Sequence, residues 1–233
     1  MKKTWLYYSK LVFQLMFKFI FFGALLFVPA QTFDWPAAWD FLITFCLLTI
    51  FITIILDRFY PKTLEARLSG FNASNQPLYD KLATPFFIIM YCFSFVMIPI
   101  DRFYLQLSAP MPVVIHYVGI ALFLIGYGIV FFAMIQNEFI APVVTIQKER
   151  GHVLRDQGLY AYIRHPLYLG LIIFFIGMGL WLDSVAGTVA GLVILLMALL
   201  PRLFIEEATL IEQLNGYREY TKRVRYRLCP FIW

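Results

Sequence analysis

Long apolar segments constrain this chain more than any other feature of its sequence. A helix needs about 20 residues to cross the roughly 30 Å hydrocarbon core of a bilayer. Six apolar segments lie near that length, although two of them are short, and we place them at 11–28, 38–56, 85–100, 112–135, 166–182 and 184–204. The sequence therefore predicts an all-α polytopic integral membrane protein with about six transmembrane helices, the last two of which form a hairpin.

The composition agrees with a membrane protein and excludes several other classes. Hydrophobic residues make up 61% of the 233 residues and charged residues only 14%, whereas charged residues are about 25% of an average soluble domain. The net charge is +5, but no basic run lies within a recognition fold, so we expect membrane lipids and no nucleic acid as partners. The three cysteines are far apart and predict neither a disulfide framework nor a metal site.

The first apolar segment contains a lysine that a membrane span would not normally carry. Val28-Pro29-Ala30 loosely resembles a signal-peptidase site. We nevertheless expect a retained span, because the segment is long for a signal peptide and Lys18 interrupts it. Lys18 then either extends toward the membrane surface or lines a polar cavity.

The distribution of Lys and Arg predicts the orientation of the chain. Three precede the first span (Lys2, Lys3 and Lys10), four lie in the second connection, four in the fourth, and six from Arg202 onward, whereas the other connections hold none or one. Cytoplasmic connections are enriched in these residues. We therefore expect both termini and the stretch 164–170 to be cytoplasmic, in a bacterial inner membrane or otherwise in the endoplasmic reticulum.

No repeat or flexible linker divides the chain, which predicts a single membrane domain. We divide it into two N-terminal spans with a polar loop (1–83) and a core (84–233). The loop at 57–83 is expected to hold a short surface helix near 64–68. Pro85, Pro112 and Pro166 each suit the first turn of a helix. Pro201 is expected to interrupt the last span, after which the chain forms an amphipathic cytoplasmic tail.

Polar residues gather on both sides of the predicted hairpin. Arg164 and His165 precede Pro166, and a helix start offers amide groups and a positive dipole end to an anionic ligand. Arg202 and Glu206 share one helix face, while Glu207 is rotated by about 100° from Glu206. Together these groups suit a zwitterionic ligand. Each group also has an alternative interpretation when it is considered alone. Arg164 and His165 could anchor the chain at the membrane interface, and the two glutamates could form a solvated helix face paired with Arg202.

The order and spacing of these residues between about 137 and 230 resemble those of the isoprenylcysteine carboxyl methyltransferase family, to which the membrane phospholipid N-methyltransferases are related. The matching residues are His152-x-Leu154, Gly158-x-Tyr160, Arg164-His165-Pro166-x-Tyr168-x-Gly170, Arg202-x-x-x-Glu206-Glu207 and Tyr217-x-x-Tyr220.

The resemblance implies an enzyme that uses S-adenosylmethionine to methylate a lipophilic or lipidated acceptor at the membrane. Carboxyl O-methylation of an isoprenylcysteine-like acceptor is our first expectation. Arg202 and Glu207 would be the catalytic residues, near the acceptor. The cofactor would contact a larger set, namely His152, Leu154, Gly158, Tyr160, Arg164, His165, Tyr168, Glu206 and Glu207.

Three other functions stay open on the sequence alone. Phospholipid amine N-methylation belongs to the same chemical class. Membrane sterol reductases, which bind NADPH, have a similar C-terminal region, although this chain is short for that group. A small transporter is the non-enzymatic alternative, but transporters usually place polar groups near the membrane midplane in paired halves, and no repeat is visible here.

Overall fold

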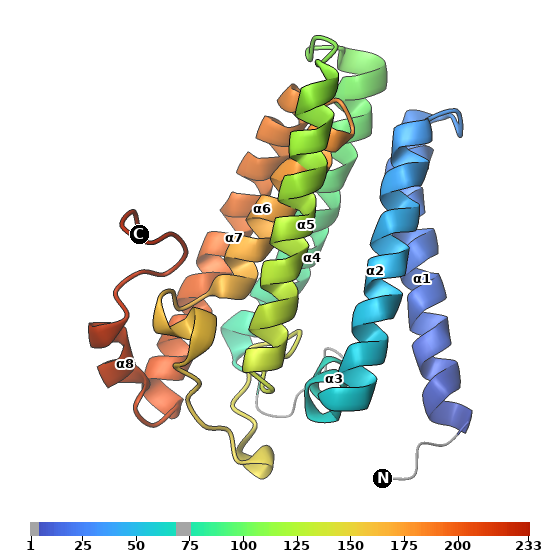
Figure 1. The fold of residues 1–233 in the computed structure, drawn as a ribbon. Helices are drawn as coiled ribbons and strands as arrows, with labels where there is room; N and C mark the ends of the chain where they lie inside the picture. Colours follow the sequence, from blue (N-terminus) through green and yellow to red (C-terminus); the bar gives the residue numbers. More distant parts are fainter. Residues whose placement is uncertain (1–4, 69–75) are drawn as a thin grey trace.

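The computed structural model describes residues 5–68 and 76–233, and helices dominate this part of the chain (Figure 1). Lys2, Lys3 and residues 69–75 of the predicted polar loop lie outside the described residues. The long helices are α1 (Trp5–Ala30), α2 (Pro36–Phe59), α4 (Leu78–Ile100), α5 (Val113–Gln136), α6 (Pro166–Trp181) and α7 (Val185–Gln213), and the short ones are α3 (Pro61–Leu68) and α8 (Tyr217–Arg223). The predicted all-α membrane fold is confirmed.

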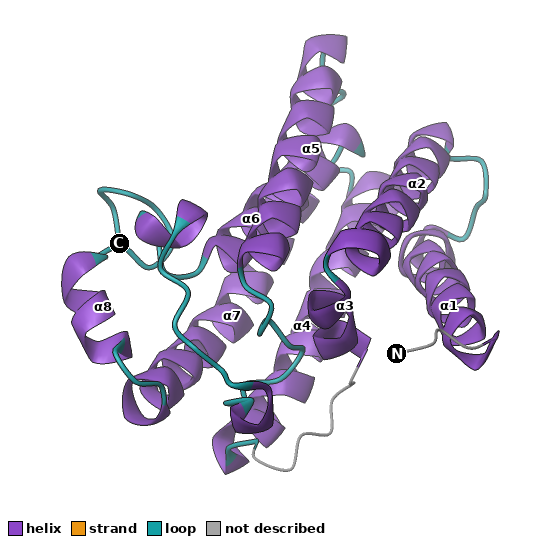
Figure 2. Ribbon diagram, turned by 60° about the horizontal axis from the view of Figure 1, so that its bottom comes forward, coloured by secondary structure: helices purple, strands orange, loops and turns teal. Residues whose placement is uncertain are grey.

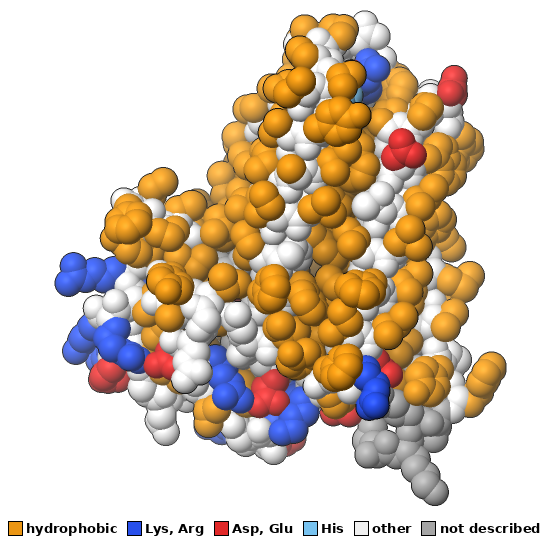
Figure 3. Space-filling model, in the orientation of Figure 1, with side chains coloured by type: hydrophobic (Ala, Val, Ile, Leu, Met, Phe, Trp, Pro, Cys, Tyr) orange, Lys and Arg blue, Asp and Glu red, His pale blue; other side chains and the backbone are white. Residues whose placement is uncertain are grey.

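Five of these helices are long and apolar enough to cross a membrane, namely α1, α2, α4 with its π-helical extension Asp101–Leu105, α5 and α7. The sixth, α6, has 16 residues and spans about 24 Å at 1.5 Å per residue. Apolar side chains cover the sides of the molecule seen in Figure 3, and most charged side chains in that view gather at its lower end. A bilayer-embedded helical bundle is expected to have this distribution.

The helices pack as two pairs with an N-terminal hairpin beside them. Helix α5 packs most extensively on α6, and α4 packs on α7, while α1 contacts α2 and α4. The hairpin of α1 and α2 stands beside the other long helices in Figures 1 and 2, and α3 follows it at the end where the described chain begins. The α6–α7 hairpin is confirmed, with Leu182–Ser184 forming its turn.

Glycines allow α5 and α6 to approach within backbone contact. A Cβ atom at Gly126 would lie 2.3 Å from the backbone nitrogen of Phe174, and one at Gly177 would lie 2.2 Å from that of Phe123. Gly119 and Gly170 face the same interface. The two glycines on each helix are seven residues apart, so they recur on one helix face. Small residues at such positions are a usual means of close helix packing in membranes.

A buried carboxylate ties the turns together at the end of the bundle opposite α3. Asp101 accepts hydrogen bonds from the hydroxyl groups of Ser108 at 2.5 Å and Ser184 at 2.6 Å. The backbone N–H groups of Leu107 and Gly187 also donate to it, at 3.0 and 3.2 Å. The start of α7 is thus fixed to the connection between α4 and α5. These donors satisfy a carboxylate that would be costly to bury unpaired.

Two predictions about prolines are wrong. Pro85 is in the second turn of α4, which starts at Leu78, and Pro201 lies inside an α7 that continues to Gln213. Proline removes one backbone hydrogen bond from a helix, and in a membrane protein neighbouring groups can compensate for that loss. Pro166 does occupy the first turn of α6, and Pro112 directly precedes α5. The predicted surface helix is confirmed as α3.

Candidate functional site

An irregular segment between α5 and α6 carries much of the site. It contains two short 3-10 turns, Lys148–Arg150 and Gly158–Ala161, and otherwise lacks regular structure (Figure 2). Gly158 has φ +62°, and a Cβ atom there would lie 2.5 Å from the side chain of Gln136. The side-chain oxygen of Gln136 also accepts the N–H of Leu159 at 2.8 Å. This turn fixes the segment against the end of α5.

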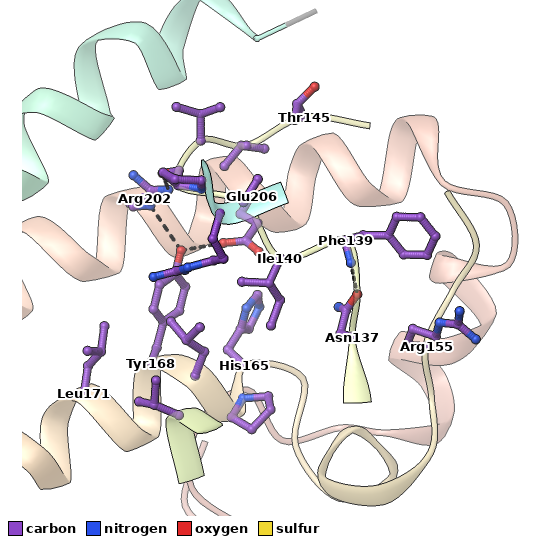
Figure 4. Close-up of a pocket in the computed structure, with 18 of the residues that line it drawn as sticks. Asn137, Phe139, Ile140, Thr145, Arg155, His165, Tyr168, Leu171, Arg202 and Glu206 are labelled. Carbon is purple, nitrogen blue, oxygen red and sulfur yellow. Dashed lines mark hydrogen bonds between the residues drawn. The ribbon is translucent and has the colours of Figure 1, made fainter. Parts of the chain in front are cut away.

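A cavity of about 590 Å³ lies between this segment, α6 and α7 and extends to α1, α3 and α4. This volume is within the range of roughly 300–1,000 Å³ that holds small molecules and cofactors. Arg202 and Glu206 come from α7, whereas Tyr168 and Leu171 come from α6 and His165 directly precedes it (Figure 4). The prediction that these separated residues meet is confirmed.

Arg202 is the centre of a hydrogen-bond network in the cavity wall. Its Nε donates to the hydroxyl of Tyr168 at 3.2 Å, Nη1 to Thr84 Oγ1 at 2.7 Å and Nη2 to the carbonyl of Pro142 at 2.6 Å. The Tyr168 hydroxyl donates to Glu206 Oε2 at 2.5 Å (Figure 4). A guanidinium has five N–H donors, so two remain beyond these three bonds.

Glu207 is a clamp rather than a lining residue of the cavity. Its Oε1 lies 2.9 Å from Arg164 Nε and 3.2 Å from His165 Nε2, and its Oε2 lies 2.7 Å from Arg227 Nε. The carboxylate is buried and joins the entrance of α6 to the segment after α8. The sequence does not predict Arg227 as a site residue. It lies 20 residues after Glu207, beyond the end of α7, so no helical spacing relates the two.

The backbone of the same segment occupies the helix entrance. The N–H groups of Arg164 and His165 donate to the carbonyls of Tyr226 and Arg227 at 3.0 and 2.9 Å. The amides of Arg164 and His165 are therefore engaged within the chain and are not themselves available to an anionic ligand. His165 is nevertheless non-helical, with φ −125° and ψ 61°, because the residue before a proline avoids the helical region.

His152 lies against Phe139 at one side of the cavity. The ring centroids are 4.2 Å apart and the planes differ by 15°, and the N–H of Gln147 donates to His152 Nδ1 at 3.3 Å. Burial, together with smaller effects of the nearby charges of Arg150 and Arg155, lowers the pKa of His152 to about 4. The imidazole is therefore neutral at pH 7 and presents a flat, uncharged surface next to an aromatic ring.

Three tyrosines close another side of the cavity. The hydroxyl of Tyr220 donates to the carbonyl of Tyr160 at 2.7 Å, and that of Tyr160 donates to the carbonyl of Ala133 at 3.4 Å. The Tyr217 hydroxyl is buried and has no hydrogen-bond partner within residues 5–68 and 76–233. Burial and the two glutamates raise the pKa of Tyr217, so its O–H stays protonated. A buried polar group without a partner is rare and points to a ligand.

Most of the predicted site residues meet at this cavity. The lining includes His152, Leu154, Tyr160, Arg164, His165, Tyr168, Arg202 and Glu206, whereas Gly158 and Glu207 are not part of it. The lining also includes residues that the motif did not supply, namely Asn137, Phe139 and Tyr217 near the polar end and Lys18 and Arg67 from the N-terminal helices. Lys18 thus lines a cavity, which agrees with one of the two alternatives expected for it.

The opposite end of the cavity is mainly apolar. Leu11, Leu15 and Phe17 come from α1 and Leu64 and Leu68 from α3, whereas Phe87 of α4 lies beside Arg202, whose guanidinium carbon is 5.3 Å from the ring centroid. These helices enclose an apolar space that is continuous with the polar end, where Arg202 and Glu206 lie. The cavity thus has the shape of a site for a molecule with an apolar chain and a polar head.

Comparison with known proteins matches the region that carries the site. Residues 114–215 match the phospholipid methyltransferase family. Among curated proteins, the protein-S-isoprenylcysteine O-methyltransferase of Schizosaccharomyces pombe is 31% identical over 94 residues, which is 40% of each chain. That of Saccharomyces cerevisiae is 36% identical over 91 residues, 39% of this chain and 38% of the relative.

A probable protein-S-isoprenylcysteine O-methyltransferase of Oryza sativa subsp. indica is 33% identical over 121 residues, 51% of this chain and 62% of the relative. The match to these proteins thus spans about two fifths of the yeast relatives and less than two thirds of the rice relative. The residues that match the family model, 114–215, include the Arg164–His165 and Arg202–Glu207 motifs. Residues 114–215 of this chain are thus similar to the phospholipid methyltransferase family, and part of the chain is similar to the protein-S-isoprenylcysteine O-methyltransferases.

Proposed function

We propose that this protein is an S-adenosylmethionine-dependent methyltransferase that methylates the carboxylate of an isoprenylcysteine-like acceptor in the membrane. The observation that carries the proposal is a single cavity with two unlike ends. One end holds Arg202, Glu206 and Tyr217, and the other is lined by apolar side chains of α1 and α3. A polar donor and an apolar-chain acceptor can meet in such a space without leaving it.

The residues present fit S-adenosylmethionine. The His152 and Phe139 rings offer flat surfaces for an adenine ring, and Tyr217 offers a hydroxyl without a partner in the described chain. Glu206 has one carboxylate oxygen, Oε2, bonded to Tyr168, which leaves Oε1 for an ammonium or ribose group. Arg164 lies beside them in the lining and suits a carboxylate. When bound, S-adenosylmethionine supplies an electrophilic methyl group on a sulfonium.

The protein has mainly to position the acceptor and exclude water, because methyl transfer from a sulfonium is an in-line displacement. A carboxylate acceptor is already ionised at pH 7 and needs no general base. Arg202 has two N–H groups beyond its three bonds to the protein, and they suit a carboxylate oxygen. Tyr168 and Thr84 hold that guanidinium in place. Glu207 positions Arg164 and His165 by its ion pairs.

We place the polar end of the cavity on the cytoplasmic side of the membrane. Lys148, Arg150 and Arg155 lie in the segment that covers it, and the connections rich in such residues are usually cytoplasmic. The methyl donor is a water-soluble cytoplasmic molecule, so this orientation gives it access. A bacterial inner membrane or the endoplasmic reticulum would both satisfy this orientation.

The test is transfer of a labelled methyl group from S-adenosylmethionine to N-acetyl-S-farnesylcysteine and to a total lipid extract, with purified protein in detergent. Label that mild base removes is an ester and supports the proposal. Saturable binding of S-adenosylhomocysteine that NADPH does not displace is the second expected result. Binding of NADPH alone would indicate a reductase, and binding of neither nucleotide would indicate a non-enzymatic role such as transport.

Phospholipid amine N-methylation is the second candidate, because residues 114–215 match the phospholipid methyltransferase family. An amine acceptor must lose a proton, and Glu206 lies in the cavity as a possible base. Label on phosphatidylethanolamine that resists mild base would establish this function and overturn carboxyl methylation.

A further inference from the structure

Two basic side chains lie at the apolar end of the cavity, outside the region shared with the known methyltransferases. Lys18 is near the middle of α1, and Arg67 is in the last turn of α3. Both line the cavity, and they are near enough to repel each other electrostatically. Neither residue belongs to 114–215, and neither takes part in the network around Arg202.

No acidic partner compensates these charges within the described part of the chain. The ion pairs of the described residues engage Lys62, Arg102, Arg155, Arg164, Arg223 and Arg227 but neither Lys18 nor Arg67. Their side chains also make no hydrogen bond to another described residue. Two like charges that face each other without a counterion are unfavourable in a membrane protein unless an anion joins them.

Arg67 is accessible yet surrounded by protein. Its side chain is exposed, but surrounding protein lowers the pKa of its guanidinium and nearby Arg202 lowers it further. A side chain with both properties faces an internal cavity. The same nearness to Arg202 connects the two basic side chains with the polar end, where the methyl group would be transferred.

Other polar groups join the pair. Gln14 is four residues before Lys18, on the same face of α1, and it also lines the cavity. Thr53 of α2 lines it as well. The amide of Gln14 can donate hydrogen bonds to an anion, whereas the hydroxyl of Thr53 already donates to the carbonyl of Thr49 at 2.7 Å. Leu11, Leu15 and Leu64 surround these groups with apolar surface.

We propose that Lys18 and Arg67 form an anion-binding subsite that attracts the carboxylate of the apolar-chain acceptor and guides it toward Arg202. This inference rests on the proposed carboxyl methylation. An ammonium group of like charge is repelled from the same place, so the subsite favours acids over amines as acceptors. The N-terminal helices thereby contribute to acceptor selection, while the shared region supplies the donor end.

The position of Lys18 favours the acceptor carboxylate over a phosphate of the surrounding bilayer. Lipid phosphates stay at the level of the membrane surface, whereas Lys18 is near the midpoint of the membrane-crossing α1. An anion that reaches Lys18 must have been drawn into the cavity. Single-chain amphiphiles with a small acidic head can enter such a space with little rearrangement of the helices.

The experiment compares two probes that differ only in charge, N-acetyl-S-farnesylcysteine and its primary amide. Binding of each to the full chain in neutral detergent is measured by calorimetry for wild type, Lys18→Met, Arg67→Gln and the double variant. We expect wild type to bind the acid more tightly than the amide. The double variant should lose about tenfold or more of that preference, because hydrogen bonds to a charged group are removed.

Matched controls separate this subsite from general charge and folding effects. Lys10→Met on α1 and Arg58→Gln at the end of α2 remove exposed basic residues that do not line the cavity, and both should keep the wild-type preference. Lys18→Arg and Arg67→Lys should also keep most of it. All variants should bind S-adenosylhomocysteine as wild type does, which shows that the donor end is intact.

The outcomes are distinct for the subsite and for the methyltransferase. An unchanged preference for the acid in the double variant, or equal binding of acid and amide by wild type, overturns the subsite. Tighter binding of a single-chain lysophosphatidate, lost in the same variants, assigns the pair to a lipid phosphate and overturns the acceptor carboxylate. Absence of S-adenosylhomocysteine binding by wild type contradicts the methyltransferase instead, while the comparison of acid and amide still tests the subsite.

Discussion

Glu207 contacts three basic side chains from two distant parts of the chain and therefore controls the shape of the site without lining it. Arg164 and His165 belong to the entrance of α6, and Arg227 belongs to the segment after α8. One buried carboxylate balances the guanidinium groups of Arg164 and Arg227, and removal of a single partner from such a cluster leaves uncompensated charge. The positions of Arg164, His165 and Arg227 should consequently change when this carboxylate is replaced.

We predict that Glu207→Gln abolishes methyl transfer while the protein stays folded. Glutamine has the same shape but only one acceptor oxygen, and its amide nitrogen would face a basic donor. Arg164 or Arg227 would move, and the donor end would lose its geometry. Methyl transfer and S-adenosylhomocysteine affinity are the measurements. Glu212→Gln, an exposed change on the same helix, is the control, and wild-type turnover by Glu207→Gln would refute the positioning role.

The lowered pKa of His152 predicts that the stability of this part of the cavity wall depends on pH. Its pKa in the folded protein is about 4, below the ordinary value of about 6.5. When the segment around His152 unfolds locally, the imidazole regains its ordinary pKa and binds a proton at pH values between 4 and 6.5, whereas the packed imidazole does not. The packed segment therefore becomes less stable as pH falls from 6.5 to 4. The protection factors of the amides in residues 146–155, that is, their exchange relative to the intrinsic rate at each pH, should therefore fall as pH falls across this interval.

Replacement of His152 isolates its contribution from that of the carboxylates, which titrate in part of the same interval. His152→Phe cannot bind a proton and should show a weaker dependence of exchange on pH above 4. His116→Phe, at the opposite end of the bundle, should behave as wild type does. Identical profiles for His152→Phe and wild type would contradict the assignment.

The motif indicated which residues meet but not how each is used. Arg202, Glu206 and Tyr168 follow from helix spacing and from the hairpin, and they line one cavity as expected. Glu207 and Gly158 lie behind the lining, because a one-residue step turns a helical side chain by about 100° and because Gly158 serves a tight turn. Arg227, Lys18 and Arg67 depend on contacts between distant segments, for which the sequence has no local signal.

Helices α5 and α6 pack closely against each other, and their contact depends on glycines, which have no side chain, at the interface. Gly126 and Gly177 leave no space for a methyl group next to the backbone of the partner helix. Tyr168 and Gly170 lie at the start of α6, so displacement of α6 also displaces the wall of the cavity. Packing at this interface and geometry at the site are thus linked.

We predict that Gly126→Ala destabilises the protein by about 1–3 kcal/mol, the usual cost of excess volume in a packed core. Gly128→Ala is the matched control on the same helix, because no other atom lies within 4 Å of its Cβ position. Alanine favours helix at that position by up to about 1 kcal/mol. Thermal unfolding in detergent should show a lower midpoint for Gly126→Ala only. Equal midpoints would contradict the close packing.

Helix positions could be predicted well because membrane thickness fixes helix length, but the helix ends that were inferred from prolines could not all be. The predicted segment at 112–135 corresponds to α5, Val113–Gln136, within one residue at each end. Pro85 and Pro201 were expected at boundaries and are inside α4 and α7. The rule that proline ends a helix reflects the soluble state, where water offers the backbone an alternative partner, and it is weaker in a bilayer.

For the whole molecule, the arrangement of charge along the membrane normal predicts its orientation. Lys148 is exposed in the turn at the α3 end, and Leu107 is exposed at the opposite end. In a variant without the native cysteines, Lys148→Cys should react with an impermeant maleimide only from the cytoplasmic side. Leu107→Cys should react only from the other side. The reverse pattern would contradict a cytoplasmic donor end.

The unpaired charges of Lys18 and Arg67 also bear on how a reaction cycle ends. An acid is attracted by them, but its methyl ester carries no charge, so the attraction is lost in the same step that forms the product. An ester with an apolar chain partitions readily into lipid, which the apolar end of the cavity adjoins. Turnover should consequently be limited little by accumulated product, and an added ester should inhibit far more weakly than an unreactive acid of the same chain.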